Sequence, residues 1–269
     1  MTPSRTDARA FLLVGLAASL PSCGAFDDGK PKSGDPLTFP DPGAGRSDAK
    51  SIRAVTDPNV PNHPAHHAQV EVTDAVVLLQ DNFDEVGNGS SRGTIYVQDL
   101  GSQSAFSGIS LFAPSFIPAN QRVAPGDVLN LRGEYQENPN IGTAVFPAGQ
   151  VLPQLSRPIA NFRYEFRTPE PTVIDANDLK DYTVGRRWIG MLVTVKGVPL
   201  TGATTDRSNR VTYYLTDDTS RNAPRVSNEL FDLKADAYPN GTTFTSITGI
   251  VTYFFNLKIA PRGVADLVQ

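Results

Sequence analysis

The stretch "GTIYVQD" (Gly93–Asp99) is matched further along the chain by "VTYYLTD" (Val211–Asp217). In both, a threonine, a β-former, a tyrosine, an aliphatic residue, a polar residue and an aspartate follow in order. Alternation of this kind is typical of a strand with one buried face. It predicts that Ile95 and Val97 face a core while Tyr96 points the opposite way. The equivalent residues of the second copy are Tyr213 and Leu215 on the buried face and Tyr214 on the other.

The match extends beyond this strand to three further pairs of segments. The pairs are "QVEVTDAVVLLQ" (Gln69–Gln80) with "WIGMLVTVKGVPL" (Trp188–Leu200), "APGDVLNLRGEY" (Ala124–Tyr135) with "YPNGTTFTSITGIVTY" (Tyr238–Tyr253), and "AVFPAGQVLP" (Ala144–Pro153) with "KIAPRGVADLV" (Lys258–Val268). The third pair shares a Pro-x-Gly, and the second pair shares a turn followed by a strand that contains Gly133 or Gly249. Four matched segments in one order predict an internal repeat of about 100 residues.

Each copy consists of short β-branched and aromatic strands separated by Gly, Pro, Asn and Asp turns. Helical signal is sparse and is confined to Pro171–Tyr182 and Ser227–Tyr238. Five strands, a long first strand bent at glycine, and an insertion between the third and fourth strands describe an OB-fold. We therefore expect an all-β protein with two tandem five-stranded OB-fold-like barrels, at 68–165 and 166–269. The alternative is a pair of immunoglobulin-like β-sandwiches, which need about seven strands each.

Two segments also carry a family resemblance. "GRRWIGMLVTVKGVPLTGAT" (Gly185–Thr204) resembles the entry strand of OB-type modules that occur beside secreted bacterial nuclease domains. "IYVQD" (Ile95–Asp99) with "PGDVLNLRGEY" (Pro125–Tyr135) is similar to the same modules. The shared strings are short and hydrophobic, so the resemblance implies the fold more than an activity.

The N-terminus has the features of an export signal. Arg5 and Arg9 precede an apolar run, Ala10–Leu20, which is too short to span a bilayer as a helix. The following Leu20-Pro21-Ser22-Cys23 resembles the lipobox of bacterial lipoprotein signal peptides. That resemblance implies cleavage of residues 1–22 and lipidation of Cys23, the only cysteine of the chain. In that family an aspartate after the cysteine signals retention in the inner membrane, so the resemblance, with Gly24 at this position, implies the outer membrane of the cell envelope.

Residues 23–67 are predicted to form a flexible tether. Gly, Pro, Asp and Ser dominate this segment, and no apolar period persists in it. Its end holds all three histidines of the chain, His63, His66 and His67. Imidazoles are good zinc or copper ligands, but adjacent histidines do not share one face of a helix or strand. We favour a solvated linker end. The sequence leaves open whether these histidines bind a metal ion.

Charge and composition argue against several classes of function. The chain has 24 Lys and Arg against 28 Asp and Glu, a formal net charge of −4, which disfavours broad attraction to nucleic acid. With every histidine in the expected tether, a histidine base inside a folded domain is not expected. The sequence therefore predicts a non-enzymatic protein without a cofactor, anchored in the membrane through Cys23. Its expected ligand is a protein, a glycan or another polymer, with a role in extracellular nucleic-acid processing as the alternative.

Four residues are candidates for ligand binding. OB-folds bind ligands on strands two and three and the flanking loops, so Tyr96 and Tyr214 would be outward-facing platforms for bases or sugars. Arg92 and Arg210 lie in the adjacent loops, where they could serve an anionic ligand. The alternative is that both tyrosines pack against the other barrel or a loop.

Overall fold

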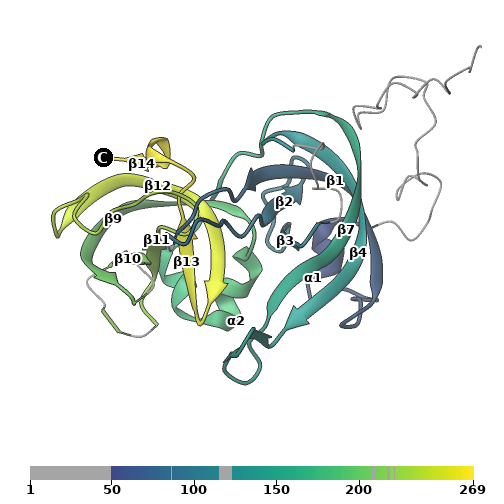
Figure 1. Cartoon of the computed structure of the whole chain (residues 1–269), viewed down its shortest axis with the longest axis horizontal. Helices are drawn as coiled ribbons and strands as arrows, with labels where there is room; N and C mark the ends of the chain where they lie inside the picture. The colour runs from purple at the N-terminus through teal and green to yellow at the C-terminus, as the bar shows by residue number, and fades with distance from the viewer. Residues whose placement is uncertain (1–49, 86, 115–122, 208–209, 217–218, 221) are drawn as a thin grey trace, which may run out of the picture.

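The computed structural model describes residues 50–269, apart from 86, 115–122, 208–209, 217–218 and 221. These residues form two β-barrels that lie side by side (Figure 1). The expected signal peptide, the expected lipidation site at Cys23 and most of the expected tether lie outside the described residues.

The first barrel is a closed ring in the order β1-β2-β3-β7-β4. Its strands are β1 (Gln69–Gln80), β2 (Ile95–Asp99), β3 (Gly108–Phe112), β4 (Asp127–Asn138) and β7 (Leu152–Glu165). β3 and β7 pair in parallel, and the other neighbours are antiparallel. A small hairpin of β5 (Asn140–Ile141) and β6 (Ala144–Val145) lies in the loop between β4 and β7.

The second barrel repeats this topology. Its ring is formed by β9 (Leu192–Thr205), β10 (Val211–Tyr214), β11 (Arg225–Ser227), β13 (Asn256–Ala260) and β12 (Thr242–Phe254), and the β12–β9 pairing closes it. β11 and β13 are parallel, as β3 and β7 are. The chain is thus an all-β protein with two five-stranded OB-like barrels, and the sandwich alternative is wrong because each five-stranded sheet closes on itself.

Strand two has the predicted orientation in both barrels. Ile95, Val97 and Leu215 are completely buried, and Tyr213 is 2% exposed. Tyr96 and Tyr214 are partly exposed on the opposite face. A shift of one residue in register would have reversed every one of these positions, so the alignment of the two copies is confirmed at this strand.

The repeat holds for three of the four segment pairs. Gly133 and Gly249 both lie on the fourth strand of their barrel, and a Cβ on either would collide with the neighbouring fifth strand, at 2.9 Å from the Leu155 side chain and 2.6 Å from the Ala260 carbonyl oxygen. The Pro-x-Gly pair is not equivalent. Ala144–Pro153 mostly precedes the fifth strand of its barrel, whereas Lys258–Val268 mostly follows the fifth strand and ends in β14 (Leu267–Val268).

The prediction of a flexible tether is wrong for residues 50–67, which belong to the first barrel. Lys50 bridges Val72 in parallel, and the helix α1 (Ile52–Thr56) follows, with Ile52 and Val55 fully buried in the core. Ser51 caps the helix by accepting a hydrogen bond from the backbone of Ala54. A short apolar helix beside a closed barrel can bury its side chains. The composition of residues 23–67 as a whole did not indicate this helix.

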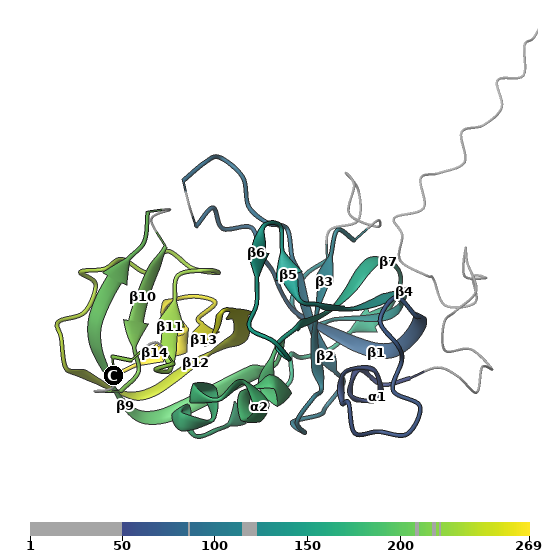
Figure 2. The ribbon, with the colours of Figure 1, turned by 90° about the horizontal axis from the view of Figure 1, so that it is seen from below.

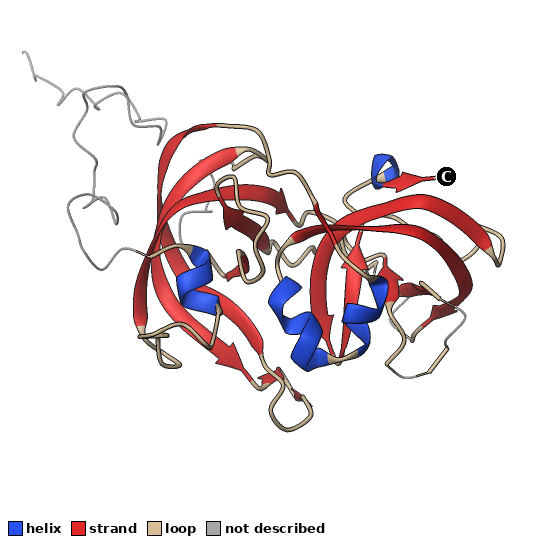
Figure 3. Cartoon of the chain, turned by 180° about the vertical axis from the view of Figure 1, so that it is seen from behind, coloured by secondary structure: helices blue, strands red, loops and turns tan. Residues whose placement is uncertain are grey.

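The second barrel begins with the same arrangement. β8 (Thr172–Val173) pairs in parallel with β9 and leads into η1 (Ala176–Lys180), α2 (Tyr182–Gly185) and η2 (Arg186–Trp188). Figure 3 shows these helices on one side of the molecule. The helical prediction for Pro171–Tyr182 is therefore confirmed, whereas Ser227–Tyr238 forms turns rather than helix.

Asp99 connects the first helix to its barrel. Its carboxylate accepts hydrogen bonds from the backbone nitrogens of Ile52, at 2.6 Å, and Arg53, at 3.0 Å. Burial raises the pKa of Asp99 to about 6, although the two backbone hydrogen bonds oppose this rise. The matching Asp217 lies outside the described residues.

The two barrels are in direct contact. Leu78 of β1 packs with Leu192, Leu230 and Ile250 of the second barrel, and all four are buried. Beside this cluster the Gln98 side chain accepts a hydrogen bond from the backbone of Leu192 at 3.0 Å. Because this contact is apolar and well packed, it fixes the position of one barrel against the other.

A candidate binding cleft between the barrels

A cleft of about 490 Å³ lies where the first barrel faces the second. Its floor comes from β2, β3, β4 and β7, together with the loop before β2 and the β5–β6 hairpin. Figure 2 shows this hairpin at the junction of the barrels. The opposite wall comes from β12, from Ile189, which follows η2, and from the segment after β11. The floor is therefore the face on which OB-folds bind their ligands.

The floor is built from one row of residues that crosses four strands. Tyr96 on β2 pairs with Ser110 on β3, Ser110 with Gln154 on β7, and Gln154 with Gln136 on β4. Side chains at paired positions point to the same side of a sheet. The ring thus brings together an aromatic side chain, a hydroxyl and two amides that are far apart in the sequence.

Hydrogen bonds hold the two amides in place. Gln136 donates to the carboxylate of Glu134 at 2.8 Å, and Gln154 donates to the Gln136 carbonyl oxygen at 3.1 Å. Asn138 donates to the same oxygen at 3.4 Å. The hydrogen bonds of Gln136 and His67 lower the pKa of Glu134, so the carboxylate stays charged and orients the Gln136 amide.

The opposite wall is aromatic. Tyr253 and Phe254 line the cleft from the end of β12. Phe146 of the first barrel packs edge-on against both, with ring centroids 4.8 Å from Tyr253 and 6.2 Å from Phe254. The Tyr253 hydroxyl also donates to the side chain of Gln150 at 2.5 Å. This wall is therefore tied to the first barrel, and the cleft is preformed.

The charged groups around the cleft are paired. Arg92 of the first barrel and Arg210 of the second both contact the buried Glu85 carboxylate, each at 2.9 Å. Glu229, which lines the cleft, lies 2.6 Å from the ammonium group of Lys258. Each charged lining residue is therefore in contact with a side chain of opposite charge, although Arg92 shares Glu85 with Arg210.

The structure separates the four predicted site residues. Tyr96 and Arg92 line the cleft, and Arg210 lies next to it, with its guanidinium 6.0 Å from the Phe254 ring. Tyr96 also packs against the apolar cluster around Leu78. This tyrosine therefore both lines the cleft and packs against the other barrel. Burial, with a smaller effect from Glu229, raises its pKa. Tyr214 is not part of this cleft, and its ring lies 4.9 Å from the guanidinium of Arg225.

The histidines lie against β4, so the expectation of a flexible linker end is wrong, whereas the expected exposure to solvent holds for His66 and His67. His63 lies edge-on to Tyr135, with ring centroids 5.4 Å apart, and His66 accepts from the backbone of Glu137 at 2.9 Å. His67 contacts the carboxylate of Glu134. Across the described residues, no group of three or more His, Cys, Asp or Glu side chains is arranged to hold a metal ion.

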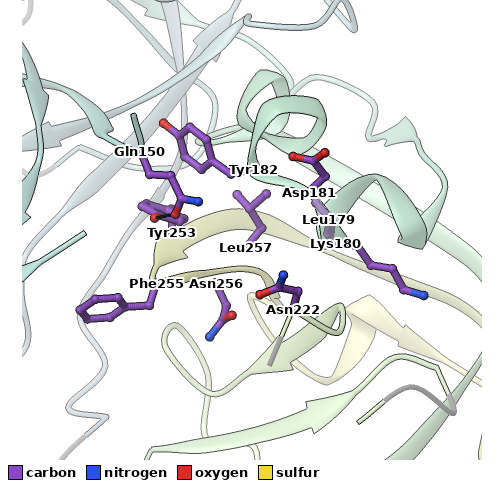
Figure 4. A pocket seen from close by; sticks show the side chains of 10 residues that line it. All are labelled: Gln150, Leu179, Lys180, Asp181, Tyr182, Asn222, Tyr253, Phe255, Asn256 and Leu257. Carbon is purple, nitrogen blue, oxygen red and sulfur yellow. Dashed lines mark hydrogen bonds between the residues drawn. The ribbon is translucent and has the colours of Figure 1, made fainter. Parts of the chain in front are cut away.

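A second cavity, of about 350 Å³, lies on the far side of Tyr253 (Figure 4). Its lining comes from Gln150, the helical segment before β9 and the β12–β13 hairpin. The Tyr182 hydroxyl in it donates to the backbone oxygen of Val151 at 2.5 Å, and Asp181 accepts from the backbone of Thr183. Since its tyrosines and its aspartate already serve the junction and the helix, this cavity is the weaker candidate.

Most residues of the cleft were not predicted from the sequence. Alternation along the strands would have placed three of the amides, those of Gln136, Asn138 and Gln154, on the outer face of the barrel. The aromatic wall from β12 could not be found this way, because it depends on how the two barrels are docked.

Amides, hydroxyls and aromatic rings can hold a ligand by hydrogen bonds and stacking. The fold and the cleft define a protein with two OB-like barrels and a preformed cleft between them that is a candidate binding site. No protein-family model matches the chain, and no curated protein matches its sequence. None of the helices in the described part of the chain is long and apolar enough to cross a membrane.

Proposed function

We propose that the chain is a non-enzymatic lipoprotein of the bacterial cell envelope that binds its ligand in the cleft between the barrels. The observation that carries this proposal is the position of the cleft. It lies on the face formed by β2, β3 and the loops around them, where OB-folds bind their ligands. Its volume is typical of ligand sites, and its aromatic and polar lining is of the kind that fixes a ligand.

The anchoring part of the proposal rests on the lipobox-like Leu20–Cys23 and the apolar run before it. Acyl chains on Cys23 would hold the chain at the membrane, since two or more chains anchor stably. The full chain carrying Cys23→Ser should leave the membrane fraction or remain uncleaved. A variant that stays membrane-bound and is normally processed would refute the anchor.

The cleft can be tested with two matched phenylalanine variants. Phe112 lines the cleft and is 53% exposed, whereas Phe166, also on the first barrel, is 50% exposed and is not part of the lining. The full chain in detergent would be titrated with neutral hexasaccharides, a heparin hexasaccharide and a dodecamer of thymidylate. At least one probe should bind, and its affinity should fall in Phe112→Ala but not in Phe166→Ala. The proposal fails if no probe binds or if both variants behave alike.

A further inference from the structure

The cleft has a chemical character that narrows the ligand class. Its floor carries uncharged polar side chains, among them Ser110, Gln136 and Gln154. Each amide nitrogen carries two hydrogens and uses one of them in the hydrogen bonds above, so Gln136 and Gln154 each keep a donor, and the carbonyl oxygen of Gln154 can accept. A hydroxyl can also donate and accept. A ligand with many hydroxyl groups, each both donor and acceptor, complements such a floor.

The aromatic rings of the cleft belong both to the floor and to the opposite wall. Tyr96 and Phe112 lie on adjacent strands of the first barrel, and Phe254 belongs to the opposite wall. Aromatic rings contact apolar faces of a ligand without requiring charge. A pyranose ring has such an apolar face of C–H groups and hydroxyls around its edge. The cleft therefore offers both kinds of contact that a sugar unit needs.

The charges argue against a polyanion. Among the described residues that line the cleft, only Arg92 and Glu229 are charged, and they belong to ion pairs with Glu85 and Lys258. Binding of a nucleic-acid backbone depends on cationic groups that neutralise phosphates. An extended peptide would add to a free strand edge, but the four floor strands are each paired on both sides.

We propose that the cleft binds a neutral oligosaccharide, with the row of Ser110, Gln154 and Gln136 bonding its hydroxyls and Tyr96 and Phe112 stacking on its rings. This inference rests on the proposed function, because it names the ligand class of the same cleft. The hydrogen bonds from Gln136 to Glu134 and from Gln154 to Gln136 hold the amides before the ligand arrives. Preorganisation of this kind lowers the ordering cost of binding.

The test uses cellohexaose, maltohexaose and the hexamer of N-acetylglucosamine as probes for the full chain in detergent, followed by isothermal titration calorimetry. At least one should bind, with an affinity that changes less than about twofold between about 50 mM and about 500 mM salt, since no ion pair is formed with the ligand. The variant Gln136→Met keeps the shape of the side chain and removes the amide. It should weaken binding by about 3- to 10-fold, as expected for one neutral hydrogen bond.

Gln69→Met is the matched control, because Gln69 is an exposed strand residue that does not line the cleft. The inference is overturned if none of the three neutral probes binds, or if Gln136→Met and Gln69→Met bind equally well. If the thymidylate or heparin probe binds instead and loses affinity in Phe112→Ala, the ligand class is wrong while the cleft stands. If no probe responds to Phe112→Ala, the proposed function itself fails.

Discussion

The buried carboxylate of Glu85 forms ion pairs with two arginines, Arg92 of the first barrel and Arg210 of the second. Close to it lie two further buried acids, Asp81 and Glu229. Three carboxylates in a desolvated region repel one another, and ion pairs offset this repulsion only in part. The effect is seen at Asp81, because burial and the charges of Glu85 and Glu229 raise its pKa to about 6. A backbone hydrogen bond from Phe83 and the charge of Arg92 act in the opposite direction and lower this pKa.

The variant Asp81→Asn should stabilise the protein above this pKa. In the folded state the carboxyl has a pKa of about 6, above its ordinary value of 3.8, so the folded state binds the proton more tightly. The free energy of unfolding therefore falls as pH rises through this window and remains lower above it. Asparagine removes the charge and still accepts the hydrogen bond from Phe83. We expect a gain of about 1–3 kcal/mol at a pH of about 7.5.

Urea unfolding of the full chain at a pH of about 4 and about 7.5 measures this gain, which should shrink at the lower pH. Asp99 titrates in the same window and keeps part of the pH dependence in the variant. Asp232→Asn is the control, since Asp232 is exposed. Equal stability of Asp81→Asn and the wild type at both pH values would contradict the argument.

Strand two provides a second prediction for single residues. Val97→Ala and Leu215→Ala should each lower the free energy of unfolding by about 2–4 kcal/mol, because both side chains are fully buried. Tyr214→Ala should cost less, since Tyr214 is partly exposed and lies on the outer face. Denaturant melts of the three variants would show this order. A larger loss for Tyr214→Ala than for Leu215→Ala would contradict it.

At the scale of elements, each barrel is preceded by a short parallel strand and a helical cap. In the first barrel the cap is α1, with Lys50 bridging β1, and in the second it is η1 with α2, preceded by β8. The repeat unit is therefore longer than the five strands of the barrel. It begins at about residue 50 in the first copy and about residue 171 in the second.

Truncation of α1 at its buried face tests this cap. Ile52 is fully buried in the core of the first barrel, so Ile52→Ala should lower the free energy of unfolding by about 2–4 kcal/mol. Ile159→Ala is the matched control, because Ile159 on β7 is 38% exposed and should cost much less. Calorimetry of both variants measures the difference. If Ile52→Ala melted like the wild type, residues 50–67 would act as a tether after all.

Periodicity predicted the strands, their number and the buried face of strand two, because alternation reflects burial within a single element. It failed at α1, because a helix of one turn and a half is too short to show a period, and the surrounding Pro and Asp dominate its composition. The helical signal of Pro171–Tyr182 was visible in the second copy. Its counterpart, Ile52–Thr56, could have been found by extending the repeat toward the N-terminus.

At the scale of the whole molecule, the cleft exists because the barrels are docked in one arrangement. The apolar cluster around Leu78 fixes one part of the contact, and the rings of Phe146 and Tyr253 fix another. No local pattern encodes this docking, since it depends on surfaces that come together only after both barrels have formed. For that reason the floor of the cleft was partly predictable from the sequence, and its opposite wall was not.

The docking depends on two glycines whose backbones touch. Gly108, at the start of β3, lies against Gly190, which precedes β9 and has a φ of +80°. A Cβ on Gly108 would contact the backbone carbon of Gly190 and lie 2.5 Å from the backbone nitrogen of Met191. Backbone atoms cannot move aside as a flexible side chain can, so Gly108→Ala must shift one barrel relative to the other.

We therefore expect Gly108→Ala to lower the free energy of unfolding by about 1–3 kcal/mol, as overpacking does, and to weaken ligand binding in the cleft. Gly263→Ala is the matched control, because Gly263 has extended backbone and open space around its Cβ position. Urea unfolding of the full chain measures the loss of stability, and titration with the oligosaccharide probes measures binding. Small-angle X-ray scattering measures the shift of the barrels as a larger radius of gyration. If Gly108→Ala kept the stability, dimensions and binding of the wild type, the glycine contact would not determine the docking of the barrels. The Leu78 cluster and the aromatic wall alone would then hold the cleft in place.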